Sequence, residues 1–159
     1  MKNKAFKKLL NENRQVISKI CNAYSNNEEE FEDYFQEVAL QIWKSYESFE
    51  GKSKISTWIY RISLNVCLSE IRKKERRIST YSLKPEIDSL KQEQKDNQEQ
   101  IKELYRAIRT LKKIDRAIII LYLEEKQYKE MAEILGISVS NIGVKINRIK
   151  KELKEKLNG

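Results

Sequence analysis

Apolar residues recur at helical spacing along most of the chain, and the recurrence is interrupted once, near the middle. Most aromatic side chains lie between about residue 5 and residue 78, and apolar periodicity returns in the last sixty residues. The intervening stretch contains the only proline and almost no apolar side chain in its second half, so it cannot bury a core. We therefore expect an all-α protein of two small helical domains, residues 1–78 and 101–159, joined by a flexible, partly helical linker, residues 79–100.

The apolar pattern of the C-terminal domain predicts two helices at its start. The first carries Leu104, Ile108 and Leu111, and the second carries Ile118, Leu121 and Tyr122. Asp115 lies between the two sets and is a candidate N-cap, because an Asp side chain accepts hydrogen bonds from the free amides at a helix start.

A helix-turn-helix pattern follows. Residues 128–135 form a short amphipathic segment, and Gly136 can end it because glycine adopts the left-handed conformation common after a helix. Ser138 is the expected N-cap of the next helix, with Ile137 and Ile142 placed to pack across that cap. Two helices joined by a short turn containing glycine are typical of DNA-binding helix-turn-helix units.

The last helix has two chemically different faces at 100° per residue. One stripe is apolar and comprises Ile142, Ile146, Ile149, Leu153 and Leu157. The opposite face offers donors for base edges and phosphates: Ser140, Val144, Asn147, Arg148 and Lys151, flanked by Asn141 and Lys145. A plain solvated face would explain the charges alone, but not an outward Val144 or a glycine inside a helix. Close approach to a DNA backbone would explain Gly143.

An N-terminal segment, residues 29–49, predicts a helix with a core stripe and a second, mixed face. The stripe is Phe31, Phe35, Val38, Ile42 and Tyr46. The far face is Asp33, Gln36, Glu37, Leu40 and Lys44, with Trp43 near its border. Exposed apolar residues beside acids indicate a surface for docking another protein. The alternative is a helix covered on both sides within its own domain.

A basic loop and a long basic helix follow. Gly51, Lys52, Ser53 and Lys54 form the loop, Ser56 or Thr57 can cap the helix, and Trp58, Ile59 and Ile62 turn inward. The helix ends with Arg72, Lys73, Lys74, Arg76 and Arg77. Bases at a helix C-terminus favour the helix dipole without any further role. Together with the loop and Arg61, however, they provide the phosphate-neutralising, aromatic-flanked surface that single-stranded nucleic acid requires.

Composition narrows the classes of function. Lys and Arg outnumber Asp and Glu by 32 to 24, a net charge of +8 that favours anionic partners such as nucleic acid. The chain has no His, which excludes His-activated nucleophiles and His-ligated metals, and it has no Gly-rich phosphate loop. Cys21 and Cys67 fit small buried residues of a reducing compartment. We expect a cytoplasmic protein without membrane insertion, enzymatic activity, cofactor or metal.

These segments, in this order, resemble a bacterial sigma factor of the small extracytoplasmic-function (ECF) group, within the sigma-70 superfamily. DYFQEVALQIW is similar to the helix that grips the clamp helices of the RNA polymerase beta-prime subunit. FEGKSKISTWIYRISLN and IRKKERR resemble the segment that recognises and melts the minus-ten promoter element. YKEMAEILGISVSNIGVKINRIKKEL resembles the helix-turn-helix that recognises the minus-thirty-five element.

The resemblance implies a transcription initiation factor, with roles for individual residues. For polymerase binding it implies Asp33, Gln36, Glu37 and Leu40. For minus-ten recognition and melting it implies Lys52, Ser53, Lys54, Tyr60, Arg61, Asn65 and Arg72, with a flipped base held by the loop around residues 50–56. For minus-thirty-five recognition it implies Ser140, Asn141, Val144, Lys145 and Arg148. The implied partners are core RNA polymerase (beta-prime clamp helices and beta flap), promoter DNA and, as in many members, an anti-sigma protein.

One departure affects the preferred base sequence. Many members carry Thr-Val-Lys-Ser-Arg at the start of the recognition helix, where this chain has residues 141–145, NIGVK. Two other classes of function stay open from the residues alone. One is a stand-alone, dimeric helix-turn-helix repressor or activator, and the other is an interaction module that antagonises polymerase without binding DNA.

Overall fold

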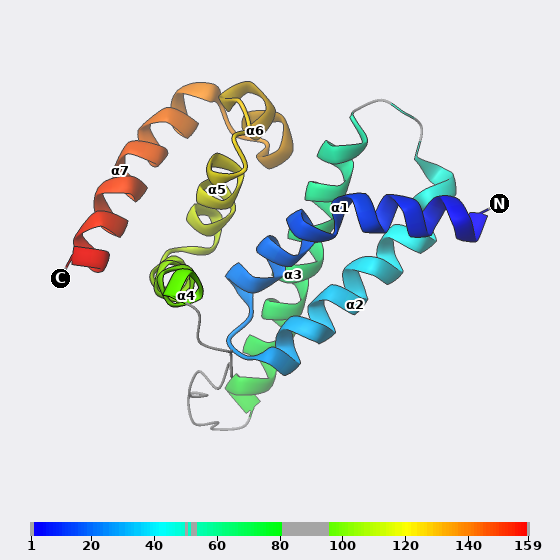
Figure 1. The fold of residues 1–159 in the computed structure, drawn as a ribbon, viewed down its shortest axis with the longest axis horizontal. Helices are drawn as coiled ribbons and strands as arrows, with labels where there is room; N and C mark the ends of the chain where they lie inside the picture. Colours follow the sequence, from blue (N-terminus) through cyan, green and yellow to red (C-terminus); the bar gives the residue numbers. More distant parts are fainter. Residues whose placement is uncertain (1, 50, 52–53, 81–95, 159) are drawn as a thin grey trace. The chain divides into compact units, whose positions relative to one another are not determined.

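The computed structural model describes residues 2–49, 51, 54–80 and 96–158, and every regular element in these ranges is a helix (Figure 1). The chain divides into two compact units, Met1–Asp88 and Ser89–Gly159. The helices are α1 (Lys2–Tyr24), α2 (Glu28–Ser45), the 3-10 turn η1 (Tyr46–Ser48), α3 (Ile55–Thr80), α4 (Asp96–Arg109), α5 (Lys113–Leu123), α6 (Tyr128–Leu135) and α7 (Val139–Asn158). The predicted all-α class, with two helical domains, is confirmed.

In the N-terminal unit, α1, α2 and α3 each pack against the other two. The largest fully buried side chains are isoleucines, one or more from each helix: Ile17, Ile20, Ile42 and Ile59. The start of α2 is fixed by a reciprocal cap. The Asn27 side chain accepts from the Glu30 amide at 2.8 Å, and the Glu30 carboxylate accepts from the Asn26 amide at 2.8 Å.

The core stripe of α2 differs from the predicted one. Tyr34, Val38 and Ile42 are buried, whereas Phe31 and Phe35 are only half-buried at the edge of the stripe. There the two Phe rings lie 6.3 Å apart, and the Arg14 guanidinium lies 5.4 Å from the Phe35 centroid. The helix is therefore rotated by a fraction of a turn from the predicted orientation, because its contacts with α1 and α3 cover the side that carries Tyr34.

The predicted caps of α3 and α5 are also wrong. Helix α3 begins at Ile55, with the Trp58 amide donating to the Lys54 carbonyl, so Ser56 and Thr57 lie inside its first turn. Helix α5 begins at Lys113, and Asp115 lies in its first turn rather than before it. In both cases the helix begins earlier in the sequence than its polar residues indicate.

Cys21 and Cys67 are free and completely buried, as expected, and their sulfurs lie 4.0 Å apart between α1 and α3. The hydrogen bond between the two thiols, together with burial, raises the pKa of Cys67 well above its usual range. The Cys67 thiol is therefore protonated at neutral pH, which agrees with a packing role.

In the C-terminal unit, α4, α5 and α6 all pack against α7. Its largest fully buried side chains include Ile108, Ile118, Met131, Ile142 and Ile146. Burial along α7 continues through Ile149 to Leu153, but Leu157 is exposed, so the predicted apolar stripe ends one turn early. Helices also enter both ends of the predicted linker, since α3 continues to Thr80 and α4 starts at Asp96. The middle of that linker lies outside the described residues.

Candidate nucleic-acid and protein interfaces

The helix-turn-helix has the predicted geometry at each of its joints. Helix α6 ends at Leu135, and Gly136 adopts the left-handed conformation with φ of 71°, donating its amide to the Ala132 carbonyl at 2.8 Å. The Ser138 hydroxyl accepts from the Asn141 amide at 3.1 Å, which caps α7. A tight corner thus joins α6 to α7 and fixes which side of α7 is covered.

The outward side of α7 carries the predicted DNA-contacting residues. Ser140, Asn141 and Arg148 are exposed, Val144 is 69% exposed, and Lys145 is half-buried. Asn147 and Lys151 lie on the same exposed side. Four of the five predicted residues therefore lie on the exposed sides of α7, and Lys145 lies at the border of the buried isoleucine stripe.

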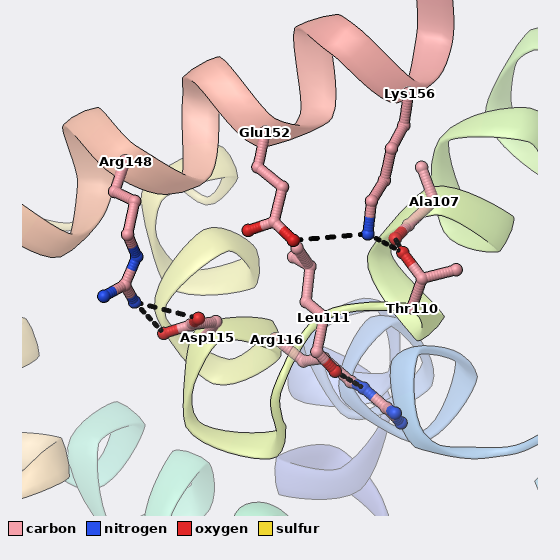
Figure 2. A network of polar contacts seen from close by, with 8 residues as sticks. All are labelled: Ala107, Thr110, Leu111, Asp115, Arg116, Arg148, Glu152 and Lys156. Atoms are coloured by element: carbon pink, nitrogen blue, oxygen red, sulfur yellow. Dashed lines mark hydrogen bonds and ion pairs between the residues drawn. The ribbon is translucent and has the colours of Figure 1, made fainter. Parts of the chain in front are cut away.

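Arg148 forms an ion pair with Asp115, which the sequence had indicated as a helix cap. Its Nη2 donates to both carboxylate oxygens of Asp115, at 3.1 and 3.0 Å (Figure 2). The Asp115 side chain is only 3% exposed, whereas that of Arg148 is 51% exposed. The pair therefore joins the buried face of α5 to the outer face of α7. A sequence signal existed: Asp115 lies one helical turn before the apolar residues Ile118 and Ile119, where a lone carboxylate requires a partner.

The C-terminal half of α7 is tied to the turn between α4 and α5 (Figure 2). Lys156 bonds to the Thr110 hydroxyl and pairs with Glu152 at 3.3 Å. Within the turn, the Arg116 Nε donates to the Leu111 carbonyl at 3.0 Å. The bond between Lys156 and Thr110 therefore fixes the C-terminal half of α7 to this turn.

Gly143 lies against α6. A Cβ built at this position would meet the Tyr128 ring at 3.7 Å, an ordinary van der Waals contact. The expectation that the glycine serves close approach to a DNA backbone is therefore not supported, because its open side faces the neighbouring helix.

On α2, three of the four predicted polymerase-binding residues are exposed. They are Asp33, Gln36 and Leu40, the last at 42%. Glu37 is half-buried and accepts a hydrogen bond from Gln41 Nε2 at 3.0 Å. Trp43, at the border of this face, packs edge-on against Phe6 of α1, with ring centroids 5.1 Å apart. The mixed apolar and acidic face is thus present on the surface of the N-terminal unit.

The predicted minus-ten residues divide into three groups. Lys54, Asn65 and Arg72 are exposed and Arg61 is half-buried, and three of these four repeat along one face of α3. Tyr60 is the correction: it is only 2% exposed, so its ring forms part of the core and offers no face to a base. Lys52 and Ser53 lie outside the described residues, as does Glu50 of the predicted base-binding loop.

A polar groove between α2 and α3 links the two predicted interfaces of this unit. It has a volume of about 430 Å³, and Glu37, Asn65, Arg72 and Lys73 are among its lining residues. Residues assigned to polymerase and to DNA therefore share one depression. The rings of Phe49 and Trp58 contact each other, with centroids 4.9 Å apart and planes tilted by 38°.

The basic C-terminal part of α3 is partly neutralised within the unit. Lys74 pairs with Glu30 at the start of α2, and Lys73 lies 3.5 Å from Glu70. Glu30 thus caps α2 and also fixes the end of α3, a double role that sequence analysis missed. Arg72, Arg76 and Arg77 are exposed, so a cationic surface remains.

Over the described ranges, no cluster of His, Cys, Asp and Glu could hold a metal ion. Within the same residues, no helix is both long enough and apolar enough to cross a bilayer.

Comparisons with known proteins match both units. Residues 9–77 match the family model for Sigma-70 region 2, and residues 101–153 match that for Sigma-70, region 4. The ECF RNA polymerase sigma factor SigW of Bacillus subtilis is 27% identical, with 96% of this chain and 89% of that protein covered. The ECF sigma factor SigG of Mycobacterium tuberculosis is 38% identical over 64 residues, which are 40% of this chain and only 17% of that protein.

The fold has a close counterpart among solved structures. The sigma factor RpoE of Bartonella quintana, solved in complex with the anti-sigma factor NepR, superposes with a TM-score of 0.83. The sequence identity is 24%, and 98% of each chain is covered. This likeness extends over both helical units.

Proposed function

The chain belongs to the ECF group of the sigma-70 family, and on that premise we propose that it is a transcription initiation factor that binds core RNA polymerase and directs it to promoters. The N-terminal unit, residues 1–78 in this proposal, binds the polymerase and opens the minus-ten element. The C-terminal unit, residues 101–159, recognises the minus-thirty-five element as duplex. The linker between them allows both contacts within one chain.

The observation that carries the proposal is the presence of both family regions, in order, on one chain. A stand-alone helix-turn-helix regulator would need only the second, so the region 2 match favours an initiation factor. The exposed face of α2 supports polymerase docking, since it combines the acid Asp33 with the exposed Leu40. The basic face of α3, with Arg72, supports contact with an opened strand.

For promoter contacts we assign Lys54, Arg61, Asn65 and Arg72 to the minus-ten element, with Lys52 and Ser53 in the adjoining loop. We assign Ser140, Asn141, Val144, Lys145 and Arg148 to the minus-thirty-five element. The partners in this proposal are the beta-prime clamp helices, the beta flap and promoter DNA. An anti-sigma protein is a further candidate partner, supported by the likeness to a sigma factor solved with one.

The decisive experiment is transcription in vitro. The full chain is added to core polymerase on genomic fragments, and start sites are mapped. We expect starts that require the chain and that share two sequence elements upstream. A chain that binds core polymerase but supports no start on any fragment would contradict the proposal.

The docking face is tested separately by charge reversal. Asp33→Lys replaces an exposed acid on α2 by a base. It should weaken binding to core polymerase about tenfold or more, because the new positive charge would face the positively charged polymerase surface that an acidic docking face is expected to contact. Glu12→Lys makes the same change on the exposed side of α1 and should bind normally. Affinity is measured by titrating labelled chain with core enzyme. Equal affinities for the two variants would contradict the assignment of this face.

A further inference from the structure

The ion pair between Asp115 and Arg148 occupies only part of the guanidinium. Nη2 donates to both carboxylate oxygens, at 3.1 and 3.0 Å. Each terminal nitrogen of a guanidinium carries two N–H groups, so Nη2 keeps one when the two oxygens of a single carboxylate share the other. In Figure 2 the other terminal nitrogen of Arg148 points away from Asp115 and from the helices around it. Whichever N–H group Asp115 takes, one edge of the guanidinium with two parallel N–H groups stays open.

This open edge belongs to the row of side chains that carries the candidate base contacts. Arg148 follows Val144 by one helical turn and Asn141 by two, and all three are exposed along one side of α7. In a helix-turn-helix, the second helix lies in the major groove and its outward side chains meet base edges. Two parallel donors match O6 and N7 of guanine, which are the acceptors that arginine recognises in that groove.

The carboxylate of Asp115 changes the ligand that this arginine binds best. Attraction to phosphate is electrostatic, and a negative charge 3.0 Å from the guanidinium cancels much of it. Guanine is uncharged, and its recognition depends on the directions of two hydrogen bonds. The pair therefore weakens Arg148 as a phosphate contact and preserves it as a base contact.

Asp115 also orients the guanidinium before DNA binds. Its side chain is 3% exposed, whereas that of Arg148 is 51% exposed, so the acid belongs to the interior and the arginine reaches the surface. If Arg148 left the pair, a charged carboxylate would remain buried without a partner, which is strongly unfavourable. An arginine that is already held in one orientation loses less conformational freedom on binding than an unrestrained one. The open edge is thus presented in advance.

We propose that Asp115 is a positioning residue for promoter specificity. It orients Arg148 so that the open edge of the guanidinium recognises a guanine of the minus-thirty-five element, and it lowers the attraction of Arg148 for phosphate. This inference rests on the proposed function, because it concerns how α7 meets that element. It gives a buried residue of α5 control over the base pair that the last helix prefers.

The test measures sequence preference together with salt dependence. Holoenzyme made with the full chain is studied by competition binding on a promoter in which each upstream base pair is replaced in turn, over a series of salt concentrations. The wild type should prefer G·C at one position about tenfold. Arg148→Lys keeps a positive charge beside Asp115 but has no planar pair of donors. It should therefore lose that preference while the salt dependence stays the same.

Asp115→Leu separates positioning from a structural role. It removes the carboxylate without leaving an unpaired charge in the interior, since the Arg148 side chain reaches solvent. The preference for G·C should fall about threefold, because the guanidinium is no longer held in one orientation. The slope of log affinity against log salt concentration should steepen by about one, because the arginine charge is no longer balanced. A residue that only stabilised the unit would not steepen this slope.

Two further variants complete the comparison. Asp115→Asn loses the charge and keeps an oxygen acceptor, so it should steepen the salt dependence and retain part of the preference. It also serves as the test if Asp115→Leu does not fold. Glu103→Gln removes an exposed negative charge from α4 and should change neither the ranking of sequences nor the slope, so it controls for net charge.

The results that overturn the inference are distinct from those that overturn the proposed function. An unchanged ranking in Arg148→Lys would mean that Arg148 binds phosphate. An unchanged ranking or an unchanged salt slope in the folded Asp115 variants would mean that Asp115 only stabilises the unit. A wild-type holoenzyme without any dependence on upstream sequence would contradict the proposed function itself.

Discussion

Replacing Gly143 by alanine should stabilise the C-terminal unit. Gly143 lies inside α7, where glycine is unfavourable because it loses the most backbone freedom on folding. The added methyl group would meet only the Tyr128 ring, at 3.7 Å, so no repacking is needed. The position therefore carries the cost of glycine without a steric reason for it.

The magnitude follows from helix propensity and one contact. Alanine is favoured over glycine in a helix interior by about 0.8–1.0 kcal/mol. A methyl group at van der Waals distance from a ring adds about 0.1–0.2 kcal/mol. We expect a gain of about 1 kcal/mol in the free energy of unfolding of this unit, which corresponds to about fivefold slower amide exchange along α7.

A matched control lies seven residues earlier. Gly136→Ala makes the same chemical change where φ is 71°, a conformation that costs a non-glycine residue about 1 kcal/mol, so it should destabilise the same unit. Both tryptophans, Trp43 and Trp58, lie in the N-terminal unit. Their fluorescence during urea unfolding should be the same in both variants, which confines each effect to the C-terminal unit.

Two outcomes would refute the reasoning. Faster exchange in Gly143→Ala would mean that the position cannot accept a side chain. Normal or increased stability with loss of promoter binding would restore the interpretation that glycine permits close approach to DNA. We expect the variant to be stabilised and to support transcription at the wild-type level.

Two more substitutions test the energetics of single positions. The buried Ser25 hydroxyl has no hydrogen-bond partner in the part of the chain that the structure describes. Ser25→Ala should therefore stabilise the N-terminal unit by about 1 kcal/mol, measured by urea unfolding followed by tryptophan fluorescence. A loss of stability would mean that the hydroxyl does have a partner. Glu125, in the turn after α5, has φ of 61°, a conformation that glycine adopts without strain. Glu125→Gly should therefore stabilise the C-terminal unit by about 1 kcal/mol, measured by amide exchange in α5 and α6. Unchanged exchange would mean that the turn carries no strain.

Local patterns predicted the elements whose determinants are close in sequence. Helix α6 has the predicted bounds because an amphipathic run ends at a glycine, and α7 has the predicted cap because Ser138 needs only its own following turn. The buried side of α7 followed from the recurrence of isoleucine. These features depend on neighbours a few residues away, which a sequence displays directly.

The errors concern contacts between distant residues. Tyr60 carries a hydroxyl on a helix rich in polar residues, and only the packing of the three helices determines that its ring is internal. Asp115 looked like a cap because caps are local, whereas its partner, Arg148, lies 33 residues later. The rotation of α2 has the same origin, since residues of α1 and α3 decide which apolar stripe is covered.

The ion pair between Asp115 and Arg148 also affects attempts to transplant promoter preference between relatives. An exchange of α7 alone would move the arginine and leave its acid behind on α5. In a recipient with an apolar residue at the equivalent place, the donated arginine would lose the carboxylate that fixes its guanidinium in this protein. The exchangeable unit is therefore α5 together with α7, because the acid and the arginine of this pair belong to different helices.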